Sequence, residues 1–411
     1  MKRDTVVRML LATLAAAAAA GPAAAPASDQ EQPAWAATWG APPMAAGSAL
    51  TPPRALENVT VRQVLRVSAG GRRVRVRLSN AFGSQPLRIA AAHVALHGDG
   101  PSIVPGSDRV LRFSGKESAS IPAASVAVSD PVDLTVAALG ELAVSVYVAE
   151  NTGPATFHES SRQTSFLSEP GDWTGALDLP VAESTLSRFF LSVVEVLPHD
   201  RVNVAVTMGD SITEGFGSTV DANRNWPDLL AARANRNGSR LGVVNQGIGC
   251  SRLLRDFCGP NGSGRFDRDV LAVTGATHVV VALGLNDIGL PTVVGLPDQV
   301  VTADEVITGL KQLIERAHAK GLPIYGATIT PIGSSIYPGF FTPENEAKRQ
   351  AVNLWIRTGH GFDAVIDFDR VLRDPADPTR LRAVYNSGDG VHPSDAGYQA
   401  MANAIDPSLF F

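Results

Sequence analysis

Residues 202–215, VNVAVTMGDSITEG, decide how the second half of the chain is interpreted. Residues 202–208 form an apolar run of strand length, and the run ends at Gly209-Asp210-Ser211, where small and polar residues begin. In open parallel sheets, ligands bind beyond the carboxyl ends of the strands. The stretch therefore predicts a buried strand with a functional site at its end.

The rest of this half alternates between strand and helix patterns. Further strands are predicted at 241–244, 278–283, 323–328 and 364–367, and helices at 226–235, 304–319, 343–357 and 394–405. Alternation of this kind is typical of a parallel sheet covered by helices on both faces, which is an α/β fold with three layers, α/β/α.

The chain before residue 199 has a different pattern. Residues 59–67, 73–78 and 142–148 alternate apolar with polar side chains, and turn residues separate such short segments. Many short strands with regular turns favour an all-β sandwich of jelly-roll-like type. The chain has 411 residues, which is more than one compact core usually organises. We therefore expect a β-sandwich accessory domain at 28–198 and a second domain at 199–411.

The first 27 residues have the features of an export signal. Lys2 and Arg3 supply positive charge, residues 9–20 are apolar, and small residues suitable for cleavage follow up to Ala27. The apolar run is shorter than the roughly 20 residues that a transmembrane helix needs. The sequence therefore predicts that residues 1–27 are removed and that the mature protein is secreted or periplasmic, without a stable membrane anchor.

Composition narrows the classes of partner. Hydrophobic residues make up 45% of the chain and charged residues 18%, as in globular proteins. The net charge of −5 and the lack of a long basic run argue against nucleic acid as a partner. The sequence predicts neither a metal nor another cofactor. It leaves the oligomeric state open.

Four short blocks contain the residues suited to chemistry. They are Gly209-Asp210-Ser211, the turn from Asn245 to Cys250, Gly284-Leu285-Asn286-Asp287, and Asp389-Gly390-Val391-His392. A serine hydroxyl is a poor nucleophile until a base takes its proton. Of the eight histidines, only His392 has an aspartate three residues before it in a loop. We therefore expect Ser211 to be the nucleophile, His392 its base, and Asp389 the group that orients the imidazole ring.

The same blocks supply donors for the negative charge that develops on a substrate oxygen. The candidates are the backbone N–H groups of Ser211 and Cys250 and the side-chain amide of Asn286. Taken singly, each block has a simpler interpretation as a turn or a helix cap. All four in this order, each beyond a predicted strand, favour nucleophilic catalysis.

Together these blocks resemble those of the SGNH/GDSL hydrolase family, over the whole second domain. Residues 265–269 (RFDRD) and 388–393 (GDGVHP) are similar to those of secreted bacterial members with an N-terminal β-sandwich. The resemblance implies a flavodoxin-like α/β/α domain and ester hydrolysis through an acyl-enzyme, without a metal. It also implies ester substrates, which range in this family from acetylated glycans to lipids.

Within this resemblance, the leading hypothesis is a serine esterase that removes short acyl groups, such as acetyl, from a small-molecule or polysaccharide ester. One alternative is a lipase or lysophospholipase on the same scaffold. Another is a carbohydrate-binding protein with an inactive hydrolase domain, against which the intact Ser211, Asp389 and His392 argue. The α/β-hydrolase class is excluded because the chain has no Gly-x-Ser-x-Gly motif.

Cys250 departs from the family pattern. Alignment from Asn245 places Cys250 where the family usually has glycine, and a shift of one residue would make Gly249 the donor instead. Cys250 and Cys258 are the only cysteines, and an exported protein allows them to form a disulfide. A disulfide needs Cα atoms within about 7 Å, whereas a continuous helix would hold these two roughly 12 Å apart. The disulfide therefore requires the chain to bend, although residues 251–255 look helical.

Two features of the first domain have alternative interpretations. Arg73, Arg75 and Arg77 share one face of a predicted strand, which favours a solvated sheet face over a site for an acidic glycan. Trp35 and Trp39 are suited to stacking on sugar rings, but packing of the first strand accounts for them equally well.

Overall fold

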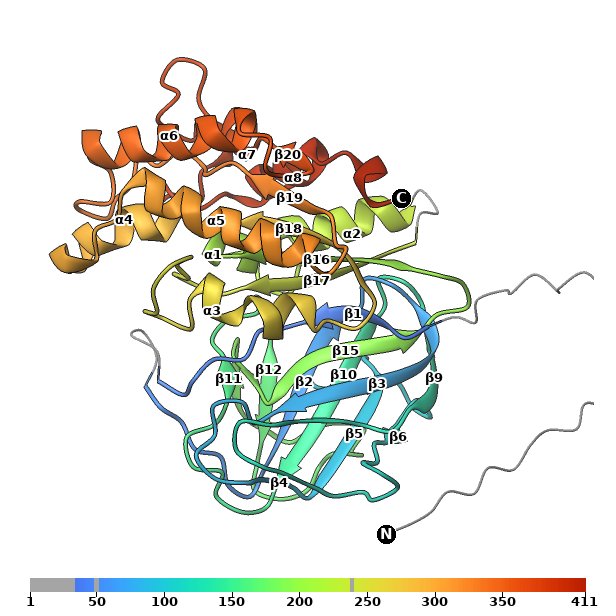
Figure 1. Ribbon diagram of the computed structural model, residues 1–411. Helices are drawn as coiled ribbons and strands as arrows, with labels where there is room; N and C mark the ends of the chain where they lie inside the picture. The colour runs from blue at the N-terminus through green and yellow to red at the C-terminus, as the bar shows by residue number, and fades with distance from the viewer. Residues whose placement is uncertain (1–33, 48–51, 237–239) are drawn as a thin grey trace, which may run out of the picture. The chain divides into compact units, whose positions relative to one another are not determined.

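The computed structural model describes residues 34–47, 52–236 and 240–411. The predicted export signal, residues 1–27, lies outside the described residues. Within these ranges the chain forms antiparallel sheets first and a parallel sheet afterwards (Figure 1).

The first half of the chain is a β-sandwich, as predicted. Its two larger sheets have the strand orders β1-β15-β3-β8, with β9 also paired to β3, and β13-β12-β2-β10-β5-β6. All pairs in both sheets are antiparallel. The strands of the first sheet are β1 (Ala36–Gly40), β3 (Gly71–Ser79), β8 (Val126–Val128), β9 (Val132–Val136) and β15 (Leu191–Leu197). Those of the second are β2 (Val59–Arg66), β5 (Ala91–Leu96), β6 (Arg109–Val110), β10 (Glu141–Val148), β12 (Ser165–Ser168) and β13 (Val181–Thr185).

Two small antiparallel pairs complete the described part of this half. They are β4 (Leu87–Ile89) with β7 (Ala119–Ile121), and β11 (Phe157–His158) with β14 (Arg188–Phe189).

The apolar faces of the two larger sheets form one core. The alternation predicted at 73–78 appears in β3, where Val74 and Val76 are fully buried in this core. Trp39 belongs to the same core and is only 8% exposed. Trp35 lies under the guanidinium of Arg75, which is 4.3 Å from the ring centroid. Packing therefore accounts for both tryptophans.

The arginines on the other face of β3 are paired. Arg75 and Arg77 bind the carboxylate of Glu195 on β15, at N–O distances of 2.5 and 3.2 Å, and the Glu195 side chain is 1% exposed. Arg77 also donates to Oγ1 of Thr274, in the second half of the chain, at 3.2 Å. The expectation of a solvated face is therefore wrong for Arg75 and Arg77, because a neighbouring strand and the second half of the chain cover it. The same pairing argues against a glycan site there.

The second half contains a parallel sheet with the strand order β17-β16-β18-β19-β20. Its strands are β16 (Asn203–Gly209), β17 (Leu241–Gly247), β18 (Ala276–Ala282), β19 (Ile324–Ala327) and β20 (Ala364–Ile366). Each strand predicted in this half corresponds to one of them. Buried valines of β16 and β18, such as Val206 and Val280, place the centre of the sheet in a second core.

Two groups of helices pack on this sheet. The helices are α1 (Ser211–Glu214), α2 (Trp226–Arg236), α3 (Gly262–Phe266), α4 (Leu285–Val293), α5 (Ala303–His318), α6 (Pro343–Thr358), α7 (Phe368–Leu372) and α8 (Asp395–Ala404), with short helical turns at η1 (Asp267–Leu271), η2 (Pro297–Gln299), η3 (Ala383–Tyr385) and η4 (Pro407–Phe410). α2 contacts α8 and β17, and α8 contacts α7, whereas α5 contacts α3, α6 and β19 (Figure 1). This arrangement is the predicted α/β/α fold. The sequence patterns predicted α2, α5, α6 and α8 but not the shorter helices.

The two halves contact each other beyond their connection along the chain. β1 lies beside β17, and the N–H of Ala37 donates to the carbonyl oxygen of Thr274 at 3.0 Å. Ala36 and Ala37 belong to the core of the second half, and Ile248 belongs to the core of the first. The two cores therefore exchange residues across the predicted boundary between residues 198 and 199.

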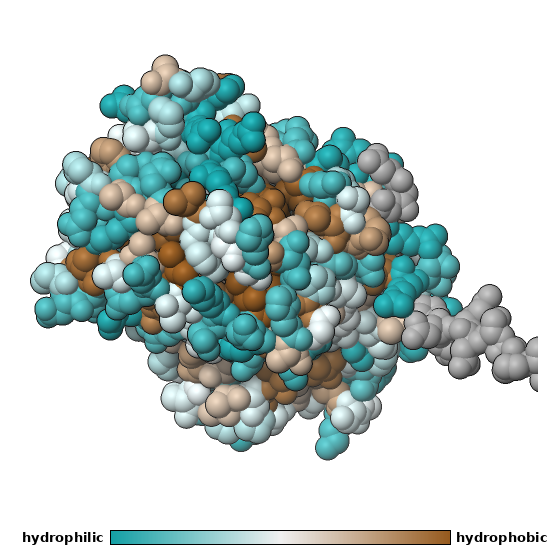
Figure 2. All heavy atoms as spheres, turned by 45° about the horizontal axis from the view of Figure 1, so that its top comes forward, coloured by the Kyte–Doolittle hydropathy of each residue, from teal (hydrophilic) through white to brown (hydrophobic). Residues whose placement is uncertain are grey.

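The outer surface is mixed in polarity. On the face that Figure 2 shows, apolar residues are most frequent toward the middle, and polar residues surround them. None of the helices in the described ranges is both long enough and apolar enough to cross a membrane.

Candidate active site

The end of β16 turns sharply into α1. Gly209 is the last residue of the strand, and a Cβ atom there would lie 1.9 Å from Oγ1 of Thr213, so this close approach requires glycine. Asp210 caps the helix, because its Oδ1 accepts the N–H of Ile212 at 3.0 Å. Ser211 is thereby placed at the first position of α1, at the carboxyl end of a central strand, where it is 9% exposed.

Ser211, His392 and Asp389 form a continuous chain of hydrogen bonds. Ser211 Oγ is 2.8 Å from His392 Nε2, and His392 Nδ1 is 2.5 Å from Asp389 Oδ2. An imidazole whose Nδ1–H donates to a carboxylate presents the lone pair of Nε2 to the hydroxyl, which is the arrangement needed to take its proton. The fold thus brings together two residues, Ser211 and His392, that are 181 positions apart.

Asp389 is held as a carboxylate by its hydrogen bonds. Burial raises its pKa, but bonds from the His392 ring and from the backbone N–H groups of His392 and Val391 outweigh burial and hold the pKa well below its ordinary range. The Tyr337 hydroxyl also donates to Oδ2 of Asp389 at 3.4 Å, and the N–H of Ile336 donates to its carbonyl oxygen at 2.9 Å. The loop that carries Asp389 and His392 is therefore fixed on two sides.

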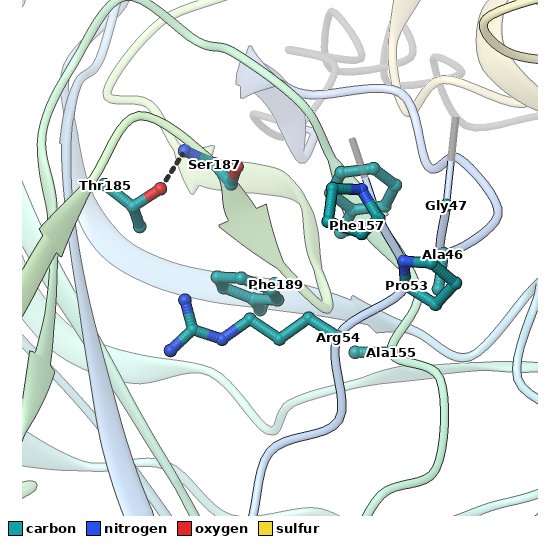
Figure 3. A pocket seen from close by; sticks show the side chains of 10 residues that line it. Ala46, Gly47, Pro53, Arg54, Ala155, Phe157, Thr185, Ser187 and Phe189 are labelled. Atoms are coloured by element: carbon teal, nitrogen blue, oxygen red, sulfur yellow. Dashed lines mark hydrogen bonds between the residues drawn. The ribbon is translucent and has the colours of Figure 1, made fainter. Parts of the chain in front are cut away.

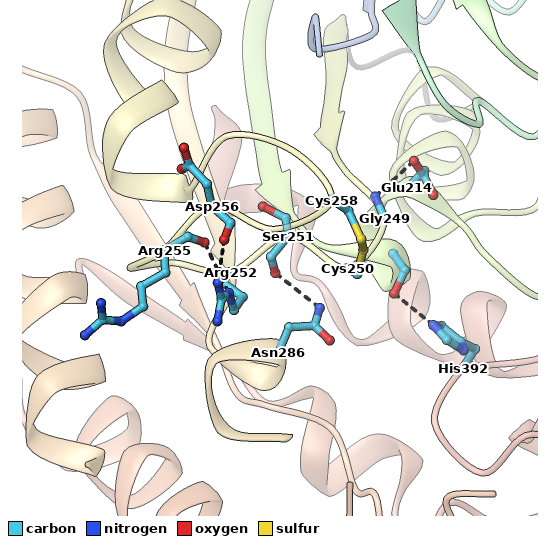
Figure 4. Close-up of a disulfide and its surroundings, with 11 residues drawn as sticks. Glu214, Gly249, Cys250, Ser251, Arg252, Arg255, Asp256, Cys258, Asn286 and His392 are labelled. Carbon is cyan, nitrogen blue, oxygen red and sulfur yellow. Dashed lines mark hydrogen bonds between the residues drawn. A yellow bond between two sulfur atoms is a disulfide. The ribbon is translucent and has the colours of Figure 1, made fainter. Parts of the chain in front are cut away.

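The turn beyond β17 carries one of the candidate donors. The N–H of Gly249 donates to Oε1 of Glu214 at 3.1 Å and is therefore engaged (Figure 4). The N–H of Cys250 has no acceptor among the described residues, so of the two positions left open by the sequence only Cys250 has a free donor. Cys250 has a φ of 46°, a conformation that favours glycine, which agrees with its alignment to a glycine position. The N–H of Ser211 is in the first turn of α1, where no intrahelical acceptor exists.

Asn286 lies in the first turn of α4, beyond β18. Its Nδ2 donates to the carbonyl oxygen of Ser251 at 3.1 Å, and because the amide has two hydrogens, the second remains for a substrate (Figure 4). The carboxylate of Asp287 accepts the N–H groups of Leu253 and Leu254 at 2.6 and 2.9 Å. The start of α4 therefore holds the turn that contains the Cys250 donor.

Cys250 and Cys258 form a disulfide, with their Cα atoms 5.9 Å apart. The chain bends between them, as the bond requires, and residues 251–255 are not helical. Hydrogen bonds to side chains replace those of the predicted helix. The Asp287 carboxylate accepts backbone N–H groups of this loop, and Arg252 donates to its carbonyl oxygens.

Four side chains at the site were not identified from the sequence: Glu214, His158, Phe216 and Tyr337. The Phe216 ring lies against His392, with centroids 4.5 Å apart, and is 44% exposed. Glu214 and His158 are buried, and Glu214 Oε1 is 3.5 Å from His158 Nε2. Nothing in the local pattern distinguishes an aromatic residue or a carboxylate at a site from one in a core or on a surface, so no sequence signal identified them.

Burial perturbs several ionisable groups around the nucleophile. It raises the pKa of Asp210 to about 6 and that of Glu214 to about 8, and it lowers the pKa of His158 to about 4. Perturbed groups of this kind gather at functional sites more often than elsewhere. Within the described ranges, no group of three or more His, Cys, Asp or Glu side chains is arranged to hold a metal ion.

A cavity of about 290 Å³ lies elsewhere, in the first half of the chain (Figure 3). Phe157, Phe189 and Pro53 line it together with Arg54, whose guanidinium is 5.8 Å from the Phe189 centroid and is paired with Glu183 at 2.6 Å. None of the candidate catalytic residues lines this cavity. The cavity and the Ser211 site are therefore separate places in the structure.

Comparison with known proteins finds a family model that matches most of the second half of the chain. Residues 207–400 match the model of the GDSL-like Lipase/Acylhydrolase family. Similar solved structures include a GDSL-like lipase from Bacteroides thetaiotaomicron VPI-5482, which is 20% identical over 50% of this chain and 87% of that chain, with a TM-score of 0.39. The lipase/acylhydrolase from Enterococcus faecalis is 21% identical over 50% of this chain and 93% of that chain (TM-score 0.39). The acetyl xylan esterase AlAXEase is 18% identical over 49% and 96% (TM-score 0.38). No curated protein matches the chain.

The matched segment contains all four sequence blocks, from the residues before Gly209 to His392. It also contains the parallel sheet that positions them. Residues 207–400 of this chain therefore belong to the GDSL-like lipase/acylhydrolase family, that is, to the SGNH/GDSL hydrolases.

Proposed function

We propose that this protein is a secreted serine esterase that hydrolyses carboxylic esters through an acyl-enzyme, with short acyl groups such as acetyl on carbohydrate as its substrates. The observation that carries the proposal is the hydrogen-bonded series from Ser211 through His392 to Asp389 at the carboxyl end of β16. Membership of an acylhydrolase family supports ester hydrolysis as the reaction.

In the first half-reaction, His392 Nε2 takes the proton of Ser211 Oγ as this oxygen attacks the ester carbonyl carbon. The carbonyl electron pair moves to the oxygen, and the negative charge is met by the N–H groups of Ser211 and Cys250 and by the Asn286 amide. The tetrahedral intermediate then collapses: the bond to the alcohol oxygen breaks, and the imidazolium gives its proton to the leaving alcohol. Asp389 stabilises the imidazolium between these two transfers.

In the second half-reaction, water replaces the alcohol. His392 takes a proton from water as the hydroxide oxygen attacks the acyl carbon, and the same three donors stabilise the second oxyanion. The intermediate releases the carboxylic acid, and the proton returns to Ser211 Oγ. Every proton in this scheme passes through His392 Nε2: from Ser211 to the leaving alcohol in the first half-reaction, and from water to Ser211 in the second.

One feature supports a cyclic alcohol as the leaving group. The exposed ring of Phe216 lies against His392, which would protonate the leaving alcohol. Aromatic rings at such places are suited to packing against the apolar face of a sugar.

The test is a panel of esters measured with the wild-type protein and with Ser211→Ala. We expect turnover of p-nitrophenyl acetate and of acetylated sugars by the wild type, a much lower kcat/KM for p-nitrophenyl palmitate, and no turnover by Ser211→Ala. A higher kcat/KM for the palmitate ester would favour the lipase or lysophospholipase alternative. Binding of polysaccharide without turnover of any ester would favour a carbohydrate-binding protein with an inactive hydrolase domain.

We expect Cys258→Ser to lower kcat more strongly than it lowers stability. The disulfide holds Cys250 at a φ of 46°, which residues with a side chain seldom adopt, so its loss lets the Cys250 N–H turn away from the substrate oxygen. Closing so short a loop is worth about 2–3 kcal/mol, and losing it lowers Tm by only a few degrees in a chain of this size. Steady-state kinetics and a thermal melt of the same samples check both parts. Two free thiols in the denatured, unreduced wild type would contradict the disulfide.

Export is part of the proposal, and the charged and apolar pattern of residues 1–27 supports it. Expression of the full chain in a bacterium with a general secretion system should release a mature protein into the periplasm or medium. Its N-terminal sequence should begin close to residue 28. A full-length chain that keeps Met1 and stays in the cytoplasm would contradict this part of the proposal.

A further inference from the structure

A buried contact between two side chains joins the β-sandwich to the candidate active site. Glu214 is the last residue of α1, three positions after Ser211, and His158 lies on β11 of the sandwich. Their side chains are each 4% exposed, and Glu214 Oε1 is 3.5 Å from His158 Nε2. A carboxyl group and an imidazole from different halves of the chain thus share a buried position behind the nucleophile helix.

Glu214 also holds the turn that precedes the Cys250 donor. The same Oε1 accepts the N–H of Gly249 at 3.1 Å (Figure 4). The strand end before it fits closely against α1, since a Cβ atom at Gly247 would lie 2.2 Å from the backbone nitrogen of Glu214. With Gly249 fixed on one side and the disulfide on the other, the free N–H of Cys250 has a defined direction.

His158 is itself fixed by backbone groups near β11. Its Nδ1 is 3.1 Å from the carbonyl oxygen of Pro42, and its Nε2 is 3.0 Å from that of Ser160. An uncharged ring has one N–H and donates to only one of these carbonyl oxygens, and this hydrogen bond orients the ring. The sandwich therefore presents a rigid surface against which the Glu214 carboxyl group packs.

We propose that Glu214 is a positioning residue for the hydrolytic reaction, which holds Gly249 so that the Cys250 N–H faces the substrate oxyanion, and that His158 of the sandwich supports Glu214 in this role. This inference rests on the proposed function of Ser211 and Cys250. It makes the sandwich a part of the catalytic apparatus, because the oxyanion donor is positioned through a residue outside the hydrolase fold.

The protonation of Glu214 decides which substitutions test the proposal. Burial raises the pKa of Glu214 to about 8, so at neutral pH most of its carboxyl groups are protonated. Glutamine has the shape and the carbonyl acceptor of a protonated glutamate, whereas methionine has a similar length and no acceptor for the Gly249 N–H. Glu214→Gln and Glu214→Met therefore differ in the one hydrogen bond at issue.

The experiment compares these two variants, His158→Ala and a control. The control is Asp228→Asn, which changes another carboxyl group where the two halves meet, 3.8 Å from Arg66, without a hydrogen bond to residues 247–250. The readouts are kcat and KM for p-nitrophenyl acetate and the inhibition constant of phenylboronic acid, which forms a tetrahedral adduct with an active-site serine. Thermal melts establish that each variant is folded.

We expect Glu214→Met to lower kcat about 10- to 100-fold and to raise the inhibition constant of phenylboronic acid by a similar factor. KM should change by no more than about twofold. Glu214→Gln should stay within about threefold of wild type, as should Asp228→Asn. His158→Ala should lower kcat in the same direction as Glu214→Met, again with little change in KM. A loss confined to transition-state binding is not what a general loss of packing produces.

A folded Glu214→Met variant with wild-type kcat would overturn the role of Glu214, and an unchanged kcat in folded His158→Ala would overturn the role of the sandwich. If Glu214→Met does not fold, a loss of kcat well beyond threefold in folded Glu214→Gln would overturn the role of the Gly249 hydrogen bond, and His158→Ala still tests the role of the sandwich. Failure of the proposed function gives a different result: Ser211→Ala would retain turnover whatever the Glu214 variants do.

Discussion

Ser211→Ala is expected to reduce kcat for p-nitrophenyl acetate by about 10⁴- to 10⁶-fold, and His392→Ala by a comparable factor. The reason lies in the geometry: His392 Nε2, the proposed base, is 2.8 Å from Ser211 Oγ, the proposed nucleophile. Ser211→Ala removes a single oxygen, so the melting temperature should stay within a few degrees of wild type.

The double variant tests whether the two residues act as one unit. Ser211→Ala/His392→Ala should be little slower than either single variant, because removing the nucleophile already abolishes the step that the base assists. The measurement is the residual rate above buffer for all three proteins at equal concentration. Losses that multiply in the double variant would show that Ser211 and His392 contribute independently, which the proposed mechanism does not allow.

Asn286→Ala is expected to lower kcat about 10²- to 10³-fold, with a much smaller change in KM. One hydrogen of the Asn286 amide binds the carbonyl oxygen of Ser251, so the substitution removes the proposed oxyanion donor and also a hydrogen bond to the loop after Cys250. Stabilisation that exists only in the transition state changes kcat and leaves ground-state affinity alone.

Asn203→Ala is the matched control for Asn286→Ala. Asn203 begins β16 and donates through Nδ2 to the carbonyl oxygen of Phe410 at 2.7 Å, at the end of the strand opposite Ser211. Both substitutions remove an amide that binds a backbone carbonyl, but only one of them is at the site. Equal losses of kcat in the two variants, or a change in KM alone for Asn286→Ala, would remove Asn286 from the role of donor.

The parallel sheet was predictable because its signals are local. The strand before Gly209 is mostly apolar, and the aspartate that binds His392 is three residues away from it in the chain. The same holds for the alternating pattern of β3 in the sandwich. Hydrophobic periodicity and short spacings predict such features correctly because the residues that form each pattern lie within one element or one turn.

The remaining features depend on partners that are distant in the sequence. Residues 251–255 have a helical pattern, but the carboxylate of Asp287, more than 30 residues later, binds their N–H groups and the segment stays irregular. Glu214 belongs to the stretch that decides the fold, yet its neighbour His158 comes from the other half of the chain. The pairing of Arg75 with Glu195 requires β3 to lie next to β15, which a single strand pattern does not reveal.

The exchange of core residues between the two halves bears on how such a protein can be recombined with its relatives. A crossover placed between residues 198 and 199 keeps each sheet type whole, but it separates Ala36 and Ala37 from the hydrolase core that they fill. It also separates Ile248 from the sandwich core in which this side chain is buried. A chimaera made at that junction would pair surfaces that evolved against other partners, leaving voids in both cores. A working chimaera of this protein therefore needs the sandwich and the hydrolase half taken from the same parent.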